Sequence, residues 1–336
     1  MSWEYIIHNF MKEKRTRIIV IVGPTASGKS DLALRLVLWL RKQAKHPERV
    51  KRIEGLPTDT EIISADSRQV YRGLDIGTGK VTKKEQKLVP HWLIDVANPK
   101  NPAVAGFTVD NFKKMAEQAI KDIVSRGKIP IVVGGTGLYI DALVYGINFP
   151  EVPPNPKLRL NFNRLSAEKL FDKLRKIDPK RAETIEPKNK RRLIRALEIL
   201  ESGQKIPVLD TRYNILDTRY SVLWLGLNPK DLYERISKRL DQRLKKGLIA
   251  EIKHLLYSHI LTNKRIDELG LAYREVPRYL RGEIKKEEMR NNILKSEINY
   301  AKRQMTWFKR NKKIKWLRNE KEAMRLCRSF LGRHHL

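Results

Sequence analysis

The sequence predicts an α/β fold, with a parallel sheet flanked by helices, an inserted helical domain and a helical C-terminal region. Short apolar runs alternate with helical segments in the first part of the chain, which favours a parallel sheet. Prolines interrupt this alternation at 149–156, and the pattern is helical and basic from Lys157 to about Gly203. Strand character returns at 221–227, and the chain reads as helical from Asp231 onward. The expected bounds are 1–151 and 220–336 for the core and 152–219 for the insertion.

A glycine-rich turn joins the first predicted strand to the first predicted helix. The apolar run Ile18–Val22 leads into GPTASGKS, and an apolar-periodic segment of about Asp31–Gln43 follows. This order is the context of a P-loop, whose backbone N–H groups hold phosphate oxygens, and it favours a P-loop NTPase-like fold. Lys29 supplies a positive charge, and the Ser30 hydroxyl is suited to bind Mg²⁺. The predicted phosphate site comprises Gly23, Pro24, Thr25, Ala26, Ser27, Gly28, Lys29 and Ser30.

Two polar side chains follow predicted strands, at the end of the sheet where ligands bind in open α/β folds. Asp66 follows the strand Glu61–Ala65 and is a candidate general base or Mg²⁺ ligand, although an N-cap or Asx-turn role fits its position equally well. Thr136 follows the strand Pro130–Val133 in a second glycine turn, where it could bind a phosphate or serve the turn alone. The other expected elements are a strand at Trp92–Val96 and helices at 107–126, 138–144, 190–201 (with Asn189 as its N-cap) and 285–310.

The composition indicates a soluble, polyanion-binding protein. A net charge of +32 creates strong self-repulsion, so a neutralising partner is expected, and beside a phosphate site that partner would be nucleic acid. A solvated lysine-rich surface is the alternative. Cys327 is the only cysteine, which excludes a disulfide framework and a cysteine-based zinc finger. No long apolar run or signal peptide is evident, so we expect no membrane span and a cytoplasmic location.

Three basic stretches are candidates for binding phosphate or RNA. Arg235, Arg239 and Arg243 are spaced to share one helix face. The predicted helix at 190–201 carries several arginines, which could contact RNA or simply face water. Segment 301–318 has no acidic residue and interleaves aromatic rings with lysine and arginine, a pattern typical of single-stranded RNA binding. Its rings could equally be core anchors.

Taken together, these motifs resemble the tRNA dimethylallyltransferases, which prenylate N6 of adenosine-37, next to the anticodon. The resemblance extends over nearly the whole chain in order. It rests on GPTASGKS at 23–30, SADSRQVYRGLDIGTGK at 64–80, PHWLIDV at 90–96, IPIVVGGTGLYIDAL at 129–143, RRLIRALEI at 191–199 and YAKRQMTWF at 300–308.

The resemblance implies a P-loop that binds dimethylallyl diphosphate rather than a nucleotide. The diphosphate would lie on Thr25–Ser30 with Mg²⁺, assisted by Thr136, and Arg239 would be the diphosphate arginine, with Arg235 as the second choice. Asp66 would act as the general base, and transfer would release diphosphate. The substrates would be tRNAs that read codons beginning with U, bound through the anticodon stem-loop, and the enzyme is expected to be a monomer.

The resemblance also implies an RNA-binding surface. One departure is Ala272, which stands where the family usually has glycine, and an insertion at 44–59 is another. The implied contacts are Ser67, Arg68, Gln69, Arg159, Arg191, Arg192, Leu193, Ile194, Arg195, the segment Leu269–Arg274 with Tyr273 and Arg274, and Lys302, Arg303, Gln304, Met305, Thr306, Trp307, Phe308 and Lys309.

Three other functions fit part of the pattern. A P-loop kinase of a nucleoside or small metabolite would explain the phosphate site but not the basic helical half. An adenylate isopentenyltransferase would perform the same chemistry on AMP or ADP. A non-catalytic P-loop RNA-binding protein would use nucleotide as a switch.

Overall fold

The computed structural model describes residues 15–45, 59–100, 106–204 and 219–332. The chain divides into two compact units, and each is described by itself. Unit 1 comprises residues 1–146 and 213–336, and unit 2 comprises 147–212. The predicted insertion, 152–219, overlaps unit 2 but differs from it by several residues at each end, so its bounds remain a prediction. The 44–59 insertion lies almost entirely outside the described residues.

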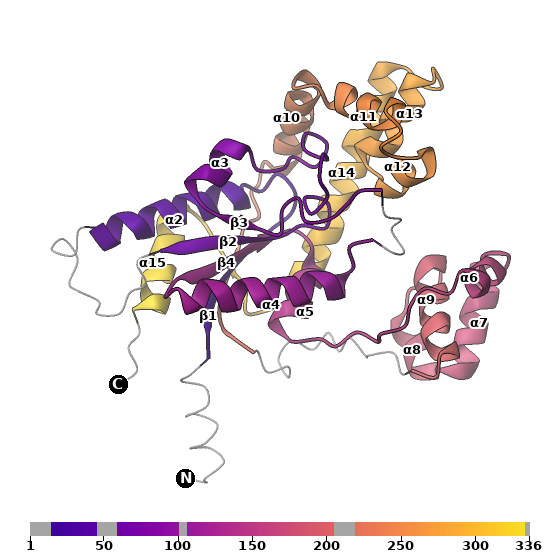
Figure 1. The fold of residues 1–336 in the computed structure, drawn as a ribbon, viewed down its shortest axis with the longest axis horizontal. Helices are drawn as coiled ribbons and strands as arrows, with labels where there is room; N and C mark the ends of the chain where they lie inside the picture. The colour runs from indigo at the N-terminus through magenta and orange to yellow at the C-terminus, as the bar shows by residue number, and fades with distance from the viewer. Residues whose placement is uncertain (1–14, 46–58, 101–105, 205–218, 333–336) are drawn as a thin grey trace, which may run out of the picture. The chain divides into compact units, whose positions relative to one another are not determined.

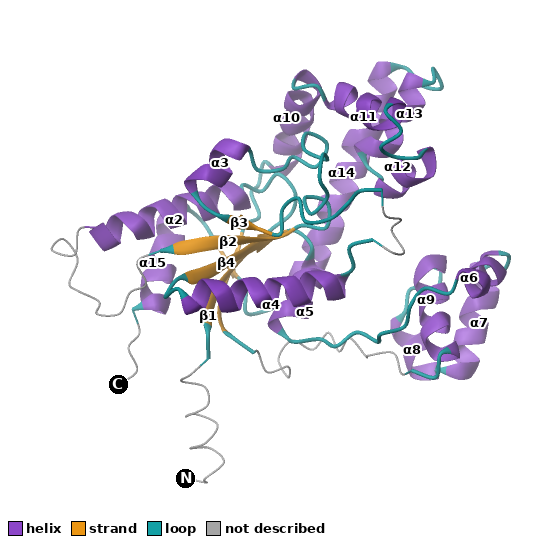
Figure 2. Ribbon diagram, viewed as in Figure 1, coloured by secondary structure: helices purple, strands orange, loops and turns teal. Residues whose placement is uncertain are grey.

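Unit 1 is built on a parallel six-stranded sheet with the strand order β3-β2-β4-β1-β5-β6. This confirms the predicted α/β class. Figures 1 and 2 show the sheet and label β1 to β4. β1 lies between β4 and β5, with Ile19 opposite Ile131 and Leu223. The strands are β1 (Arg17–Val22), β2 (Thr60–Ala65), β3 (His91–Trp92), β4 (Ile129–Gly134), β5 (Ser221–Gly226) and β6 (Lys315–Trp316).

Helices cover the sheet on both sides (Figure 2). The side chains of Ile19 and Ile21 pack with Leu36 of one helix and Cys327 of another, so burial of one strand face fixes both helices there. A third helix, Val109–Ser125, packs against β2 and β4, and its buried Phe112 stacks on the ring of Tyr139. The helices around the sheet are α2 (Lys29–Lys45), α3 (Lys83–Leu88), α4 (Val109–Ser125), α5 (Gly137–Val144) and α15 (Glu320–Leu331).

The prediction of a strand at Trp92–Val96 was wrong, because β3 ends at Trp92. Leu93 and Asp95 have φ values of 64° and 59°, which an extended strand cannot contain. The Asp95 carboxylate accepts hydrogen bonds from Lys80 and Lys83, so the segment forms a turn tied to charged neighbours.

A helical layer completes unit 1 beyond the carboxyl ends of the strands. Its core includes Leu240, Ile252 and Ile293, and it also takes in Val70 and Leu74 from the chain that follows β2. The helices are α10 (Leu232–Lys245), α11 (Leu248–Tyr257), α12 (Asn263–Leu269), α13 (Ala272–Leu280) and α14 (Lys286–Phe308). Among the described residues, no helix is long and apolar enough to cross a membrane.

Unit 2 is a small helical bundle with its own core of Leu170, Leu174, Leu193 and Leu197. Its last helix begins as predicted, because the Asn189 side chain accepts a hydrogen bond from the Arg192 amide. Its helices are α6 (Pro156–Asn163), α7 (Ala167–Ile177), α8 (Pro179–Thr184) and α9 (Lys190–Glu201).

Candidate functional site

The turn between β1 and α2 has the backbone of a phosphate-binding loop. Gly28 has a φ of 86°, and Ala26 also has a positive φ, of 61°. These conformations turn successive N–H groups toward one side, as in the anion-binding nests of P-loops. Lys29 bends back over the turn, and its Nζ donates to the Pro24 carbonyl at 3.1 Å.

The environment of Lys29 favours the binding of an anion. Burial lowers the pKa of its ammonium group to about 8; nearby Asp66 raises that pKa, and Arg239 lowers it further. A bound anion would stabilise the charged form of this ammonium group, because its negative charge compensates for the hydration that the group loses on burial.

A cleft opens beside this turn, at the carboxyl ends of β1 and β2. It brings together the P-loop, the segment after β2 and the helical layer of unit 1. Its lining residues are Thr25, Lys29, Ser30, Asp66, Arg68, Gln69, Gly77, Thr78, Arg239, Arg243, Leu269, Gly270, Leu271, Tyr273, Glu297, Tyr300 and Gln304.

Of the three arginines on one face of α10, two line the cleft. Arg239 donates from Nη1 to the Thr25 hydroxyl at 3.2 Å and from Nη2 to the Gly79 carbonyl at 3.0 Å. Arg243 forms a buried ion pair with Glu297. Arg235 does not line the cleft, and its Nε donates to Asp231 at 2.8 Å on the surface. The geometry therefore favours Arg239, the first choice, over Arg235.

Asp66 forms the local turn that its position suggested, and its carboxylate also faces the cleft, so its role as a base remains a prediction. Its Oδ1 accepts hydrogen bonds from the amides of Arg68 at 2.8 Å and Gln69 at 3.3 Å, which is the expected local turn. The same carboxylate lines the cleft with Lys29, and within the described residues Oδ2 has no hydrogen-bond partner. One oxygen therefore fixes the side chain while the other is available to accept a proton.

Thr136 lies behind the cleft rather than in it. Its Oγ1 accepts a hydrogen bond from the Ser67 amide at 3.0 Å, so it anchors the segment that follows Asp66. Its side chain also hydrogen-bonds with Tyr300, a lining residue whose pKa burial raises to about 12. In the described structure Thr136 thus supports neighbours of the site, and a direct contact with phosphate remains a prediction.

Gln304 of α14 connects the two glycine turns. Its Oε1 accepts a hydrogen bond from the Thr25 amide, and its Nε2 donates to the Gly135 carbonyl, both at 2.8 Å. Two turns that are far apart in the sequence are therefore held together by one amide side chain from the C-terminal part of the chain.

The basic stretch of α14 has one exposed and one buried side. Lys302, Arg303, Thr306 and Lys309 are exposed, as an RNA-binding surface requires. Trp307 is half-buried; its Nε1 donates to Asp141 at 2.7 Å, and the Arg310 guanidinium lies 3.9 Å from its ring centre. Met305 and Phe308 are buried. Their assignment as RNA contacts is corrected, because their side chains pack in the core.

In unit 2, the predicted contacts also divide by burial. Arg191 and Arg192 are exposed. Arg159 and Arg195 both donate hydrogen bonds to the Glu198 carboxylate. Burial is the largest single effect on the pKa of Glu198 and raises it, but the hydrogen bonds from these arginines and from the Asn155 amide together outweigh burial and lower the pKa to about 2. The assignment of Leu193 and Ile194 is likewise corrected, because both belong to the core of the bundle.

The segment at 269–274 reaches the cleft through its first half. Leu269, Gly270 and Leu271 line it together with Tyr273, whereas Arg274 pairs with Asp267 at 2.9 Å on the surface. Ala272 is fully buried as the first residue of α13 and does not have a positive φ. A glycine is therefore not required at this position, which explains how the alanine is accommodated.

Sequence reasoning did not assign five of the lining residues: Gly77, Thr78, Arg243, Glu297 and Tyr300. Arg243 lay on the recognised arginine face of α10 but was not chosen, and Thr78 lies inside a quoted motif. Tyr300 begins the last quoted motif, and Glu297 precedes it by three residues. The signal for the last two was helical spacing, since positions 297, 300 and 304 share one face of α14.

Comparison with known proteins identifies the family. Residues 69–311, well over half of the chain, match the family model described as IPP transferase. The chain belongs to the IPP transferase family. Similar curated members include the tRNA dimethylallyltransferase of Thermoanaerobacter pseudethanolicus, 40% identical over 310 residues, covering 89% of this chain and 91% of the relative. That of Anoxybacillus flavithermus is 37% identical over 302 residues, covering 89% of each chain.

Solved structures of family members share the fold. The full-length tRNA isopentenylpyrophosphate transferase of Bacillus halodurans is 33% identical with a TM-score of 0.63, covering 95% of this chain and 97% of that one. A eukaryotic dimethylallyltransferase captured acting on tRNA is 27% identical with a TM-score of 0.67, covering 87% of this chain and 70% of that one. The P-loop-like IPP transferase fold predicted from the motifs is therefore confirmed.

Proposed function

We propose that this IPP transferase transfers a dimethylallyl group from dimethylallyl diphosphate to N6 of adenosine-37, next to the anticodon of tRNAs that read codons beginning with U. The observation that carries the proposal is the cleft, which has an anion-binding turn with Lys29 and Arg239 on one side and the Asp66 carboxylate on the other. The turn, Lys29 and Arg239 would stabilise a leaving diphosphate, and Asp66 would accept a proton from an amine nucleophile.

Asp66 would act on the nucleophile. The N6 lone pair is delocalised into the adenine ring, so N6 attacks more readily when a carboxylate accepts its proton. In this step the bond from N6 to the allylic carbon forms, the bond from that carbon to the diphosphate oxygen breaks, and the proton passes to Asp66. The fixed orientation of this carboxylate supports the assignment, because its second oxygen has no competing partner within the described residues.

The leaving group would be stabilised by the turn and its cations. Lys29, Arg239 and the N–H groups of Thr25–Ser30 would face the negative charge that develops on the departing diphosphate, apart from the Thr25 and Ser27 amides, which donate to Gln304 and Pro24. Such preorganised donors stabilise a transition state without reorganising during the reaction. Because Arg239 is buried beside another guanidinium, its pKa is lowered, and an anion between them would relieve that cost.

We include Mg²⁺ as the expected cofactor. Ser30 lines the cleft and offers, in its hydroxyl group, the hard oxygen ligand that Mg²⁺ prefers. The described residues contain no cluster of three or more His, Cys, Asp and Glu side chains that could hold a metal. That donor set fits Mg²⁺, which usually takes one or two protein ligands and completes its shell with phosphate and water. When bound, the ion would neutralise charge on the diphosphate.

The RNA would reach the cleft with its target base unstacked. Arg68, Gln69 and Tyr273 line the cleft and are the proposed contacts near that base. The exposed cations of α14 and of α9 are the proposed contacts to phosphates further away. A cytoplasmic location and a monomeric state accord with this proposal and are part of it.

Labelled dimethylallyl diphosphate tests the function directly. The protein would be incubated with the label and either tRNA, AMP or no acceptor, and separately with ATP and nucleosides. Label on tRNA alone, recovered as N6-isopentenyladenosine in hydrolysates, is the expected result. Label on AMP would instead select an adenylate isopentenyltransferase, and phosphate transfer from ATP would select a kinase.

The Asp66→Asn variant tests the proposed base. Asparagine retains a side-chain oxygen for the amides of Arg68 and Gln69 but cannot accept a proton, so the local turn is preserved. Turnover should fall by about 10²–10⁴-fold while tRNA affinity changes little. Asp172→Asn, which removes an exposed carboxylate from a surface pair with Arg175, is the matched control. Turnover of the Asp66 variant close to that of the control would exclude Asp66 as the base.

A further inference from the structure

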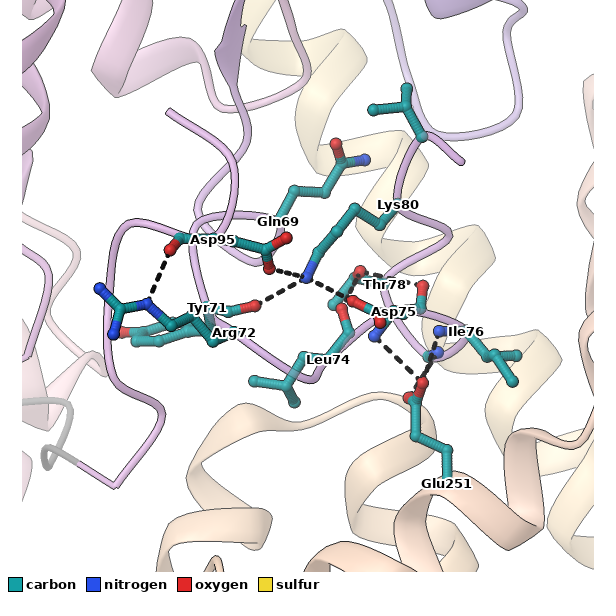
Figure 3. Close-up of polar contacts among 12 residues, drawn as sticks. Gln69, Tyr71, Arg72, Leu74, Asp75, Ile76, Thr78, Lys80, Asp95 and Glu251 are labelled. Atoms are coloured by element: carbon teal, nitrogen blue, oxygen red, sulfur yellow. Dashed lines mark hydrogen bonds and ion pairs between the residues drawn. The ribbon is translucent and has the colours of Figure 1, made fainter. Parts of the chain in front are cut away.

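The loop Leu74–Lys80 follows β2 and forms one wall of the cleft through Gly77 and Thr78. Three successive backbone amides of this loop converge on the carboxylate of Glu251 in α11 (Figure 3). The distances to the carboxylate oxygens are 3.0 Å from Asp75, 2.6 Å from Ile76 and 2.9 Å from Gly77. A single charged side chain therefore holds the turn of the loop, since charge-assisted hydrogen bonds are stronger than neutral ones.

A second charge holds the other end of the loop. The Lys80 ammonium group is 3% exposed and contacts the Asp75 carboxylate at 2.6 Å, the Asp95 carboxylate at 2.5 Å and the Tyr71 carbonyl at 2.8 Å (Figure 3). Two charged side chains therefore hold the backbone of the loop: Lys80, which belongs to the loop itself, and Glu251, which comes from the helical layer.

The carbonyl groups of the loop hold the arginines of the cleft. Arg239 donates to the Gly79 carbonyl and Arg243 to the Gly77 carbonyl, each at 3.0 Å. Gly79 has a φ of 60°, and a Cβ there would lie 2.0 Å from the Arg239 guanidinium, so loop and guanidinium are in close contact.

Arg239 depends on this loop more than Arg243 does. Arg243 has its own carboxylate partner, Glu297. Among the described residues, Arg239 forms no ion pair and is held by the Gly79 carbonyl and the Thr25 hydroxyl. Its positive charge is therefore not neutralised by an ion pair among the described residues. The position of the guanidinium depends on the Gly79 carbonyl, together with the Thr25 hydroxyl.

We propose that Glu251 is a positioning residue for the donor diphosphate: by binding the amides of Asp75, Ile76 and Gly77, it fixes the Gly79 carbonyl and so holds Arg239 against the P-loop. Glu251 does not line the cleft, and it acts through the loop. The proposal rests on the diphosphate site of the proposed function. The alternative is that Glu251 only joins α11 to the core, as its hydrogen bond from the Tyr273 hydroxyl at 3.1 Å would also do.

Binding of inorganic pyrophosphate to the full chain, measured by calorimetry, tests the proposal without catalysis. Glu251→Gln keeps the shape of the side chain but presents an NH₂ group to one of the three amides. The dissociation constant should rise about tenfold or more, which corresponds to about 1.4 kcal/mol. The control is Glu283→Gln, which removes the same charge from an exposed surface pair with Arg281. A rise no larger than that of the control would overturn the proposal.

A double-mutant cycle separates positioning from a merely structural role. In an Arg239→Gln background the guanidinium is absent, so Glu251→Gln should change the dissociation constant less than twofold. An equal weakening in both backgrounds would show that Glu251 does not act through Arg239 and would overturn the proposal. If Glu251→Gln fails to fold, Glu251→Asp enters the same cycle, with a smaller rise that must again vanish without Arg239.

The outcomes for this residue and for the proposed function are distinguishable. A wild-type protein that binds pyrophosphate but leaves tRNA unlabelled would refute the prenyl transfer, while the cycle would still decide the role of Glu251. A protein that labels tRNA but shows an additive cycle would keep its function, and the positioning role would be rejected.

Discussion

Replacement of Gln304 by methionine should destabilise the protein, because this side chain joins the two glycine turns. Gln304→Met keeps nearly the same volume and removes both hydrogen bonds. The Gly135 carbonyl is left without its partner in a buried position, and the Thr25 amide loses its acceptor at the edge of the cleft.

The magnitude follows from where these two groups lie. A buried polar group left unpaired costs about 1–3 kcal/mol, which applies fully to the Gly135 carbonyl. Water in the cleft can reach the Thr25 amide, so for that group we take the lower end, about 1 kcal/mol. The free energy of unfolding should therefore fall by about 2–4 kcal/mol. At about 2–4 °C per kcal/mol, the melting temperature should fall by at least about 4 °C.

Thermal unfolding followed by circular dichroism measures this change. The control is Gln118→Met on the exposed side of α4, which should lie within about 0.5 kcal/mol of the wild type. If Gln304→Met melts within about 1 °C of the control, the bridge contributes nothing measurable and our account of how the cleft is held together is wrong.

Three other expectations concern stability and RNA binding. Hydrogen bonds, chiefly from Arg126, lower the pKa of Glu61 to about 2, so the ionised side chain stabilises the fold above pH 4.5 and this stabilisation is lost as the pH falls toward 2. The contribution is at most about 3 kcal/mol. A Glu61→Gln variant should lose that part of the pH dependence of the free energy of unfolding, measured by urea titrations. Gly134→Ala would place a Cβ 2.1 Å from the Ala65 carbonyl oxygen, so it should cost at least about 3 kcal/mol, whereas Gly203→Ala, with open space but a φ of 76°, should cost about 1 kcal/mol; unequal melting temperatures in that order would be the evidence. Binding of tRNA should weaken by roughly a thousandfold between about 50 and 200 mM salt if about six phosphates are contacted, and filter-binding titrations that show a flat response would contradict the polyanion argument.

Local signals in the sequence predicted the local structure well. The strand–turn–helix context located the P-loop, and Asn189 located the start of α9, because each depends on neighbouring residues alone. The segment 93–96 was misjudged because its apolar residues occupy a turn whose backbone is set by the charges of Lys80 and Lys83. The hydrophobic periodicity of the sequence gives no indication of such a contact.

The details of the cleft depended on how helices are rotated in the tertiary structure. Spacing alone placed Arg235 and Arg239 on one face of α10, but packing against the core decides which of them enters the cleft. On α14, positions 301, 304, 305 and 308 follow the spacing of a buried helix face. That period was present in the sequence and was outweighed by the basic and aromatic composition of the stretch.

The bridge made by Gln304 also has a consequence for protein synthesis. Thr25 and Gln304 are 279 positions apart, so the P-loop leaves the ribosome long before the side chain that binds its Thr25 amide is made. One edge of β1 likewise stays without its partner strand until β5 has been synthesised. A nascent or prematurely terminated chain would therefore carry the whole P-loop sequence without the contacts that join it to Gln304 and to β5 in the folded protein.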